Sequence, residues 1–261
     1  MNVRPAAVAG MFYPEDPTEL EAQIDAFLAA AGQPDDPPPK AIIAPHAGTV
    51  YSGPVAASAY ARVAPAADRI RRVVLLGPAH RVFVNDLALP SVHFFRTPLG
   101  DIPLDQDLVA KVRALDGVSV SDDAHALEHS LEVHLPFLQR TLGTFTLLPL
   151  VVGRAPAEMV ARVLDAVWGG DETLIVISSD LSHFHDYATA RRIDRETSSL
   201  IEQLDHDALN GERACGAHPV SGLLAAAARR GMKVHCVDLR NSGDTAGRKD
   251  RVVGYGSYVV R

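Results

Sequence analysis

The chain lacks long hydrophobic runs and has no excess of basic residues. Its strongest apolar runs, 147–152 and 174–177, are far shorter than the roughly 20 residues that a membrane-spanning helix needs. Lys and Arg number 25 against 32 Asp and Glu, for a net charge of −7, so the chain has no general attraction for phosphate backbones or anionic membranes. These absences argue against a membrane protein and against a nucleic-acid-binding protein.

Cysteines and recognisable cofactor motifs are also scarce. The two cysteines are Cys215 and Cys236, and residues 1–10 lack the basic start and apolar stretch of a secretory signal. We therefore expect a cytoplasmic protein with free thiols. No nucleophile elbow, phosphate loop or dinucleotide fingerprint occurs, so hydride transfer and phosphoryl transfer have no support.

The composition and the periodicity predict one α/β domain over residues 1–261. Hydrophobic residues make up 47% and charged residues 22%, as in ordinary globular domains. Short apolar runs without alternation predict buried strands, at 41–44, 73–76, 146–152 and 174–177, with a final strand at 252–260. Helical periodicity occurs between them, at 16–31, 55–63, 105–115, 157–167, 188–204 and 219–230. This order predicts a mainly parallel or mixed sheet covered by helices on both faces.

Histidine and aspartate side chains follow three of the predicted strands. His46, His80, Asp180 and His183 each come shortly after an apolar run. Because the carboxyl ends of parallel strands meet at one edge of a sheet, we expect these side chains to lie together. Imidazole binds zinc, iron and copper, and sites that do chemistry keep three protein ligands and an open position. His46 and His80 are the first two candidate ligands.

Cys215 is a candidate for a third ligand. It lies just before a predicted helix, whose N-terminus would lower the thiol pKa and favour the thiolate. Sequence spacing alone leaves open that Cys215 is merely a small buried residue. Cys236 lies within the apolar run 234–239, and we expect it in the core.

The segment 128–136 is dense in titratable residues. Glu128 and Glu132 are spaced to share one face of a helix. His129 and His134 are five residues apart, so we expect them to orient ligands or contact substrate rather than bind a metal. Glu132 is expected in the same pocket. A solvated helix face is the alternative interpretation.

Six ordered motifs resemble the Memo family, which in bacteria and archaea is also called AmmeMemoRadiSam system protein B. They are Pro-Ala-Ala-Val-Ala-Gly-Met-Phe-Tyr-Pro at 5–14, Ala-Pro-His-Ala-Gly at 44–48, Gly-Pro-Ala-His at 77–80, Glu-His-Ser-Leu-Glu-Val-His-Leu-Pro at 128–136, Ser-Ser-Asp-Leu-Ser-His at 178–183 and Cys-Gly-Ala-His-Pro at 215–219. The resemblance implies a fold similar to the class III extradiol, non-haem iron dioxygenases. It also implies metal ligands at His46, His80 and Cys215.

The resemblance implies further site residues, with two departures from the family pattern. Asp180 and His183 match pocket residues beside the metal, with His183 as general acid or base. Thr49 stands where the family often has an aromatic residue, while Tyr51, two residues on, is expected to line the pocket. Ala79 replaces the hydroxyl or amide residue that often precedes the second histidine, which removes one hydrogen bond near the metal.

The expected activity is metal-dependent oxidation or reduction of an unknown substrate. The three ligands would hold one ion, with iron expected and copper or zinc as alternatives. His183 would move protons with the help of Asp180, while His129 and His134 shape the pocket.

Two other functions remain open. The pocket could bind a small molecule or peptide without catalysis, or a zinc ion could support hydrolysis with His183 or Glu132 as base. The family's second name also implies a functional link with an AMMECR1-like protein and a radical S-adenosylmethionine enzyme.

Overall fold

Four parallel strands form the centre of the molecule. The computed structural model describes residues 2–32 and 34–261. Within one sheet the central strands lie in the order β2 (Ala41–Ala44), β9 (Thr173–Ser178), β3 (Arg72–Pro78) and β8 (Thr146–Val152). The four short apolar runs predicted these strands correctly.

Antiparallel strands extend this sheet on both sides. β12 (Val252–Val260) pairs with β2, and both β11 (Val234–Asn241) and β10 (His183–His185) pair with β12. At the other edge, β4 (Leu87–Leu89) pairs antiparallel with β8 and parallel with β7 (Val118–Val120). The nine-stranded sheet is therefore mixed, with a parallel centre, which confirms the expected fold class.

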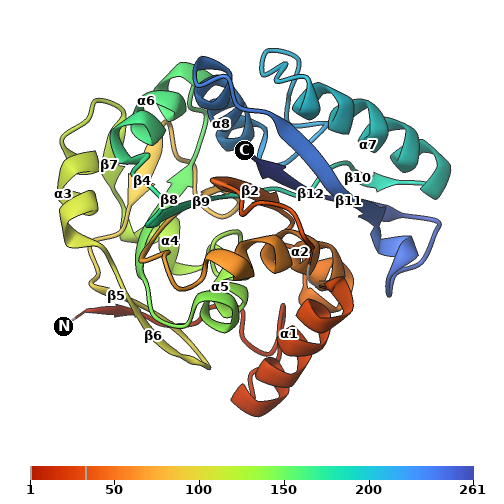
Figure 1. Ribbon diagram of the computed structural model, residues 1–261, viewed down its shortest axis with the longest axis horizontal. Helices are drawn as coiled ribbons and strands as arrows, with labels where there is room; N and C mark the ends of the chain where they lie inside the picture. The colour runs from red at the N-terminus through yellow and green to blue at the C-terminus, as the bar shows by residue number, and fades with distance from the viewer. Residues whose placement is uncertain (1, 33) are drawn as a thin grey trace.

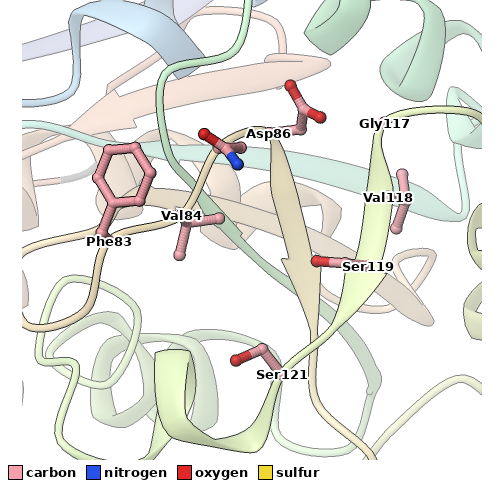
Figure 2. Close-up of a pocket in the computed structure, with 8 residues that line it drawn as sticks. Phe83, Val84, Asp86, Gly117, Val118, Ser119 and Ser121 are labelled. Atoms are coloured by element: carbon pink, nitrogen blue, oxygen red, sulfur yellow. The ribbon is translucent and has the colours of Figure 1, made fainter.

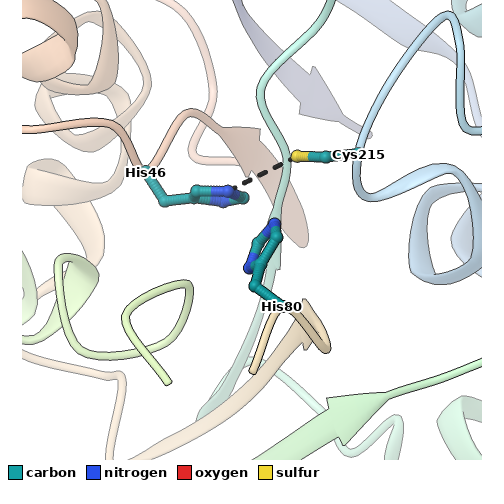
Figure 3. A group of neighbouring side chains, drawn as sticks. All are labelled: His46, His80 and Cys215. Atoms are coloured by element: carbon teal, nitrogen blue, oxygen red, sulfur yellow. Dashed lines mark hydrogen bonds between the residues drawn. The ribbon is translucent and has the colours of Figure 1, made fainter. Parts of the chain in front are cut away.

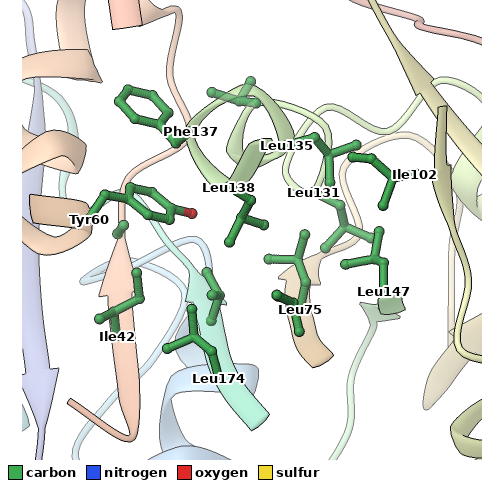
Figure 4. Close-up of a cluster of buried hydrophobic side chains, with 14 of the residues drawn as sticks. Ile42, Tyr60, Leu75, Ile102, Leu131, Leu135, Phe137, Leu138, Leu147 and Leu174 are labelled. Carbon is green, nitrogen blue, oxygen red and sulfur yellow. The ribbon is translucent and has the colours of Figure 1, made fainter. Parts of the chain in front are cut away.

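Successive residues of the central strands enter two separate cores. Val73 and Leu75 of β3 belong to one hydrophobic cluster, and Val74 and Leu76 belong to the other. Side chains alternate between the two faces of a strand, and both faces are covered here, so the sequence shows continuous apolar runs. Figure 4 shows the first cluster, where Leu75 packs beneath the helix that carries Leu135.

Helices cover the two faces (Figure 1). The first cluster lies under α1 (Pro17–Ala31), α2 (Thr49–Val63) and α5 (His134–Leu142). The second receives residues from α3 (Gln106–Arg113), α6 (Ala157–Val167), α7 (Tyr187–Glu202) and α8 (Ala217–Arg229). Six of these seven helices were predicted from periodicity, although α2 begins earlier than expected. Among the described residues, no helix combines the length and apolarity needed to cross a bilayer.

The remaining elements are short. β1 (Val3–Arg4), β5 (Phe94–Thr97) and β6 (Gly100–Pro103) form a second, three-stranded sheet. α4 (Asp122–Ala126) and the 3₁₀ turns Ala64–Ala66 and Ser242–Asp244 complete the fold. Their brevity gives no periodicity to detect, so the sequence did not predict them.

Two local predictions were wrong or only partly right. Residues 127–133 form turns and α5 begins only at His134, so Glu128 and Glu132 do not share a helical face. The Glu128 carboxylate accepts a hydrogen bond from the backbone N–H of Ser130, a local contact that competes with helix formation. Cys236 is half-buried rather than buried, although it does pack against the second cluster.

Candidate metal centre

The fold brings four of the predicted site residues to one edge of the sheet. Three adjacent, parallel strands carry a site residue two positions beyond their carboxyl ends: His46 after β2, Asp180 after β9 and His80 after β3. Cys215 comes from the segment before α8, and its backbone N–H donates to the carbonyl of Asp180 over 3.2 Å. The next residue, Gly216, passes so close that an added Cβ would lie 2.5 Å from a backbone oxygen of β9.

Three potential ligand atoms converge at this edge (Figure 3). The ligand nitrogens of His46 and His80 and the Sγ of Cys215 all lie within 4.8 Å of one another. The Cys215 Sγ is 3.4 Å from the His46 Nε2, and the two imidazole rings have centroids 5.1 Å apart. His46 is buried and His80 is partly exposed, so the group could hold one ion with an open side.

A buried serine sets the tautomer of His46. The Ser178 hydroxyl donates to the Ser130 carbonyl over 2.6 Å, so it accepts from the His46 Nδ1, also at 2.6 Å. This arrangement places the proton on Nδ1 and leaves the lone pair on Nε2, which faces Cys215. Burial, with the neighbouring His80, lowers the pKa of His46 well below its ordinary value. The imidazole is therefore neutral, as a metal ligand must be.

Glu128 performs the matching task for His80. Its Oε1 lies 2.9 Å from the His80 Nδ1, and the carboxylate also accepts from the backbone N–H groups of His80 and Ser130. Burial alone would raise the pKa of Glu128, but these hydrogen bonds lower it to about 2. A carboxylate bonded to the second nitrogen of a histidine is the usual way in which proteins orient a metal-binding imidazole. The sequence gives no signal that pairs Glu128 with His80, because 48 residues separate them.

Asp180 contacts the segment that carries His46, and His183 follows Asp180 by three residues at the start of β10. The Asp180 carboxylate accepts from the His46 backbone N–H at 2.8 Å, and burial raises its pKa although the charge of His183 opposes this. The His183 Nδ1 donates to the Leu181 carbonyl over 2.8 Å. A carbonyl can only accept, so the neutral His183 ring keeps its free lone pair on Nε2.

The Cys215 thiol does not have the lowered pKa that its place before a helix suggested. Burial raises its pKa, and the charge of Asp180 raises it further. These effects outweigh the hydrogen bonds from the Asp180 and Gly216 backbone, so the free protein keeps a neutral thiol. A cation bound at this position would reverse the balance and favour the thiolate.

His129 is the pocket histidine that the structure places closest to the candidate ligands. Its ring stacks on His80 with centroids 4.6 Å apart and meets His46 edge-on at 5.4 Å. Burial lowers its pKa to about 4, so it is neutral at neutral pH. Tyr51 lies exposed in the first turn of α2.

His134 and Glu132 have other partners. His134 is fully buried at the start of α5, and its Nδ1 lies 2.9 Å from the Tyr60 hydroxyl. Glu132 forms a buried ion pair with Arg4 and accepts from the Tyr13 hydroxyl at 2.5 Å and from the backbone of 7–8. Its carboxylate is thus committed to the N-terminal segment, and this geometry does not place it as a base in the pocket.

The family model and the sequence relatives point to one family, and a solved structure shows a similar fold. Residues 4–259 match the family model described as Memo-like protein. A MEMO1 family protein of Aquifex aeolicus is 38% identical, covering 98% of each chain, and one of Sulfolobus acidocaldarius is 31% identical, covering 97% of each. An uncharacterized protein of Escherichia coli K12 has a similar fold, with a TM-score of 0.55 and 14% identity over 83% of this chain and 98% of that one.

Proposed function

Because the chain belongs to the Memo-like protein family, we propose that it holds one metal ion between His46, His80 and Cys215 and uses it in an oxidation or reduction reaction. The observation that carries the proposal is that three ligand atoms from three separate segments lie within 4.8 Å of one another. Ser178 and Glu128 support it, since each holds one imidazole with its free nitrogen available as a ligand.

The donor set suits a transition metal. Two imidazoles and one thiol exclude the oxygen-preferring ions magnesium and calcium and favour iron, copper or zinc. Iron is our proposal; when bound, it supplies electron transfer and an open coordination position. Three protein donors are the number found in sites that do chemistry rather than in closed structural sites.

The residues around the ion supply proton transfer and orientation. The His183 Nε2 is the atom that accepts or donates a proton, because its Nδ1 is fixed on the Leu181 carbonyl. Asp180 lies close enough to His183 for the two side chains to interact electrostatically. Asp180 also holds the His46 backbone N–H, so the same carboxylate positions a ligand-bearing turn.

The most direct test of the ligand set is optical spectroscopy of the protein loaded with Co²⁺. A cobalt–thiolate charge-transfer band should appear in the parent protein and be absent from Cys215→Ser. Cys236→Ser is the matched control, because Cys236 is the second free, half-buried cysteine, and it should keep the band. An unchanged band in Cys215→Ser would contradict the proposal.

The redox assignment needs a separate test. Protein loaded anaerobically with Fe²⁺ should consume oxygen in the presence of a substrate, and His46→Ala should abolish the uptake. His183→Gln should retain the iron but react more slowly, by the factor of about 10² to 10⁴ typical of a lost acid–base group. Hydrolysis supported by zinc, or ligand binding that is indifferent to metal, would overturn the redox assignment in favour of one of the alternative functions.

A further inference from the structure

A small cavity of about 170 Å³ adjoins the candidate metal centre and contains an arginine. Cys215 lines it on one side, Arg154 enters from the segment after β8, and His218 belongs to the first turn of α8. Most of the remaining wall is apolar, with Val82 and Phe83 from the loop that follows His80. The cavity is therefore a small, open space with a mixed apolar and polar lining and one arginine, beside a proposed metal ligand.

The charge of this cavity differs from that of the chain as a whole. None of its lining residues is acidic, although the chain carries a net charge of −7. In the part of the chain that the structure describes, no carboxylate lies within ion-pair distance of Arg154. Its guanidinium lies 5.7 Å from the centroid of the Phe83 ring, so the arginine rests on an aromatic side chain and keeps its hydrogen-bond donors available.

The two larger cavities do not share this character. One, of about 450 Å³, lies along β4 and β7, and its only charged lining residue among those described is Asp86 (Figure 2). The other, of about 520 Å³, is lined by Arg71 and Arg72. Asp105 pairs with the Arg72 guanidinium at 2.9 Å, and Arg71 donates to the backbone carbonyls of Asp68 and Ile70. An unpaired arginine beside a candidate metal centre is thus the feature that distinguishes the smallest of the three.

We propose that this cavity binds the carboxylate of a small organic acid, which is the substrate class of the adjoining metal centre. The inference rests on the proposed function. Arg154 holds the carboxylate through two parallel hydrogen bonds, and Val82 and Phe83 cover the apolar body of the acid. One water molecule occupies roughly 30 Å³ in the liquid, so the cavity of about 170 Å³ has room for about six groups of that size. A site with a single arginine suits a ligand with one negative charge better than a phosphate dianion.

The test uses metal-free protein, benzoate and its neutral analogue benzamide. In an NMR titration, benzoate should bind the parent protein at least about tenfold more tightly than benzamide, which is the effect of one charge-assisted hydrogen bond. Arg154→Gln should remove this preference, and Arg154→Lys should restore only part of it because lysine lacks the planar fork.

Arg251→Gln is the matched control. Arg251 also lies over an exposed phenylalanine, with its guanidinium 4.3 Å from the centroid of the Phe184 ring, but it does not line the cavity. It should keep the preference for benzoate. Equal binding of the two probes to the parent protein, absence of benzoate binding, or equal losses in Arg154→Gln and Arg251→Gln would each overturn the proposal.

A titration with phosphate tests the class of ligand. Phosphate binding more tightly than benzoate would overturn the assignment to a carboxylate.

A titration of metal-free Cys215→Ser separates this inference from the proposed function. It should still show the preference for benzoate, because no metal takes part. If the cobalt–thiolate band fails to form while this preference persists, the proposed function fails and the carboxylate site stands. If the cobalt–thiolate band forms normally but the preference for benzoate is absent, the carboxylate site fails and the proposed function stands.

Discussion

Two buried glutamates lie four residues apart in one turn segment, and Arg4 contacts both, but their carboxylates have different partners. The Glu128 region consists of Glu128, His80 and Ser130, and its carboxylate holds a candidate metal ligand. The Glu132 region consists of Glu132, Arg4 and Tyr13, and its carboxylate fixes the N-terminal segment to the core. The partner of a buried carboxylate, rather than residue type or spacing, therefore decides whether it supports the site or the fold.

The two regions should also differ in what the loss of the carboxylate costs. In the Glu132 region both charges are buried, with Arg4 4% and Glu132 0% exposed, so removing one charge leaves the other buried without a counter-charge. In the Glu128 region the partner is a partly exposed histidine that can remain neutral. Loss of Glu132 should therefore cost stability, whereas loss of Glu128 should cost metal affinity.

The largest expected effect is on stability in the Glu132 region. Glu132→Ala should lower the free energy of unfolding by about 3–5 kcal/mol, because it leaves Arg4 buried and unpaired. Urea denaturation of the metal-free protein measures this. The double variant Arg4→Met with Glu132→Leu is the control. It should recover only part of the loss, because it removes the unpaired charge but leaves the Tyr13 hydroxyl and the backbone N–H groups of 7–8 without their acceptor. A loss below about 1 kcal/mol, the value of an exposed pair, would contradict this account of the region.

Acid should destabilise the same side of the molecule. His125, whose carbonyl accepts from Arg4, is buried, and burial lowers its pKa from 6.5 to about 4. The unfolded chain takes up this proton below pH 6.5, whereas the folded chain does so only near pH 4. The free energy of unfolding is therefore highest above pH 6.5 and falls as the pH drops towards 4. Titration of His125 should account for roughly 3 kcal/mol of this fall.

Urea denaturation at several pH values tests this dependence. The free energy of unfolding should fall steadily between pH 6.5 and about 4, where the folded His125 finally titrates. His125→Gln should show a shallower fall, since it removes one of the buried histidines. A parent protein whose stability is flat across this range would rule out the neutral, buried state of His125.

In the Glu128 region the expected effect is on metal affinity. Glu128→Gln keeps the shape of the side chain but removes the charge that orients His80, so the affinity for Co²⁺ should fall about 10- to 100-fold. Competition with a chelator measures this change. Glu132→Gln is the matched control, and its folded fraction should keep the parent affinity. If both variants lose affinity equally, the distinction between the two regions is wrong.

The smallest expected effect concerns the serine that holds His46. Ser178→Ala removes the hydroxyl between the His46 Nδ1 and the Ser130 carbonyl, and the affinity for Co²⁺ should fall about three- to tenfold, as for one net hydrogen bond. Ser257→Ala is the control, because this buried serine donates to the Val55 carbonyl instead. An equal affinity in the two variants would remove Ser178 from the site.

The sequence predicted the strands and the convergence of His46 and His80 because both follow from short-range patterns. Buried parallel strands give apolar runs, and their carboxyl ends necessarily share an edge. The partners Ser178 and Glu128 depend on contacts across 132 and 48 residues, which no local pattern records. The turns at 127–133 escaped prediction because the Glu128 carboxylate bonds to backbone N–H groups where the spacing favoured a helix.

The thiol pKa of Cys215 could not be predicted for a related reason. The position of the residue before α8 is visible in the sequence, but its burial beside Asp180 depends on the tertiary fold. Metal ligation by Cys215 was implied by the family resemblance, whereas its distance to His46 required the structure.

The most direct test of the central claim is elemental analysis of the protein purified anaerobically without added metal, beside His46→Ala, His80→Ala and Cys215→Ala. His235→Ala, on the exposed face of β11, is the control. We expect roughly one iron ion per chain in the parent and the control, as three converging ligands imply, and none in the three variants. A parent that stays metal-free after reconstitution, or variants that retain the ion, would contradict the account.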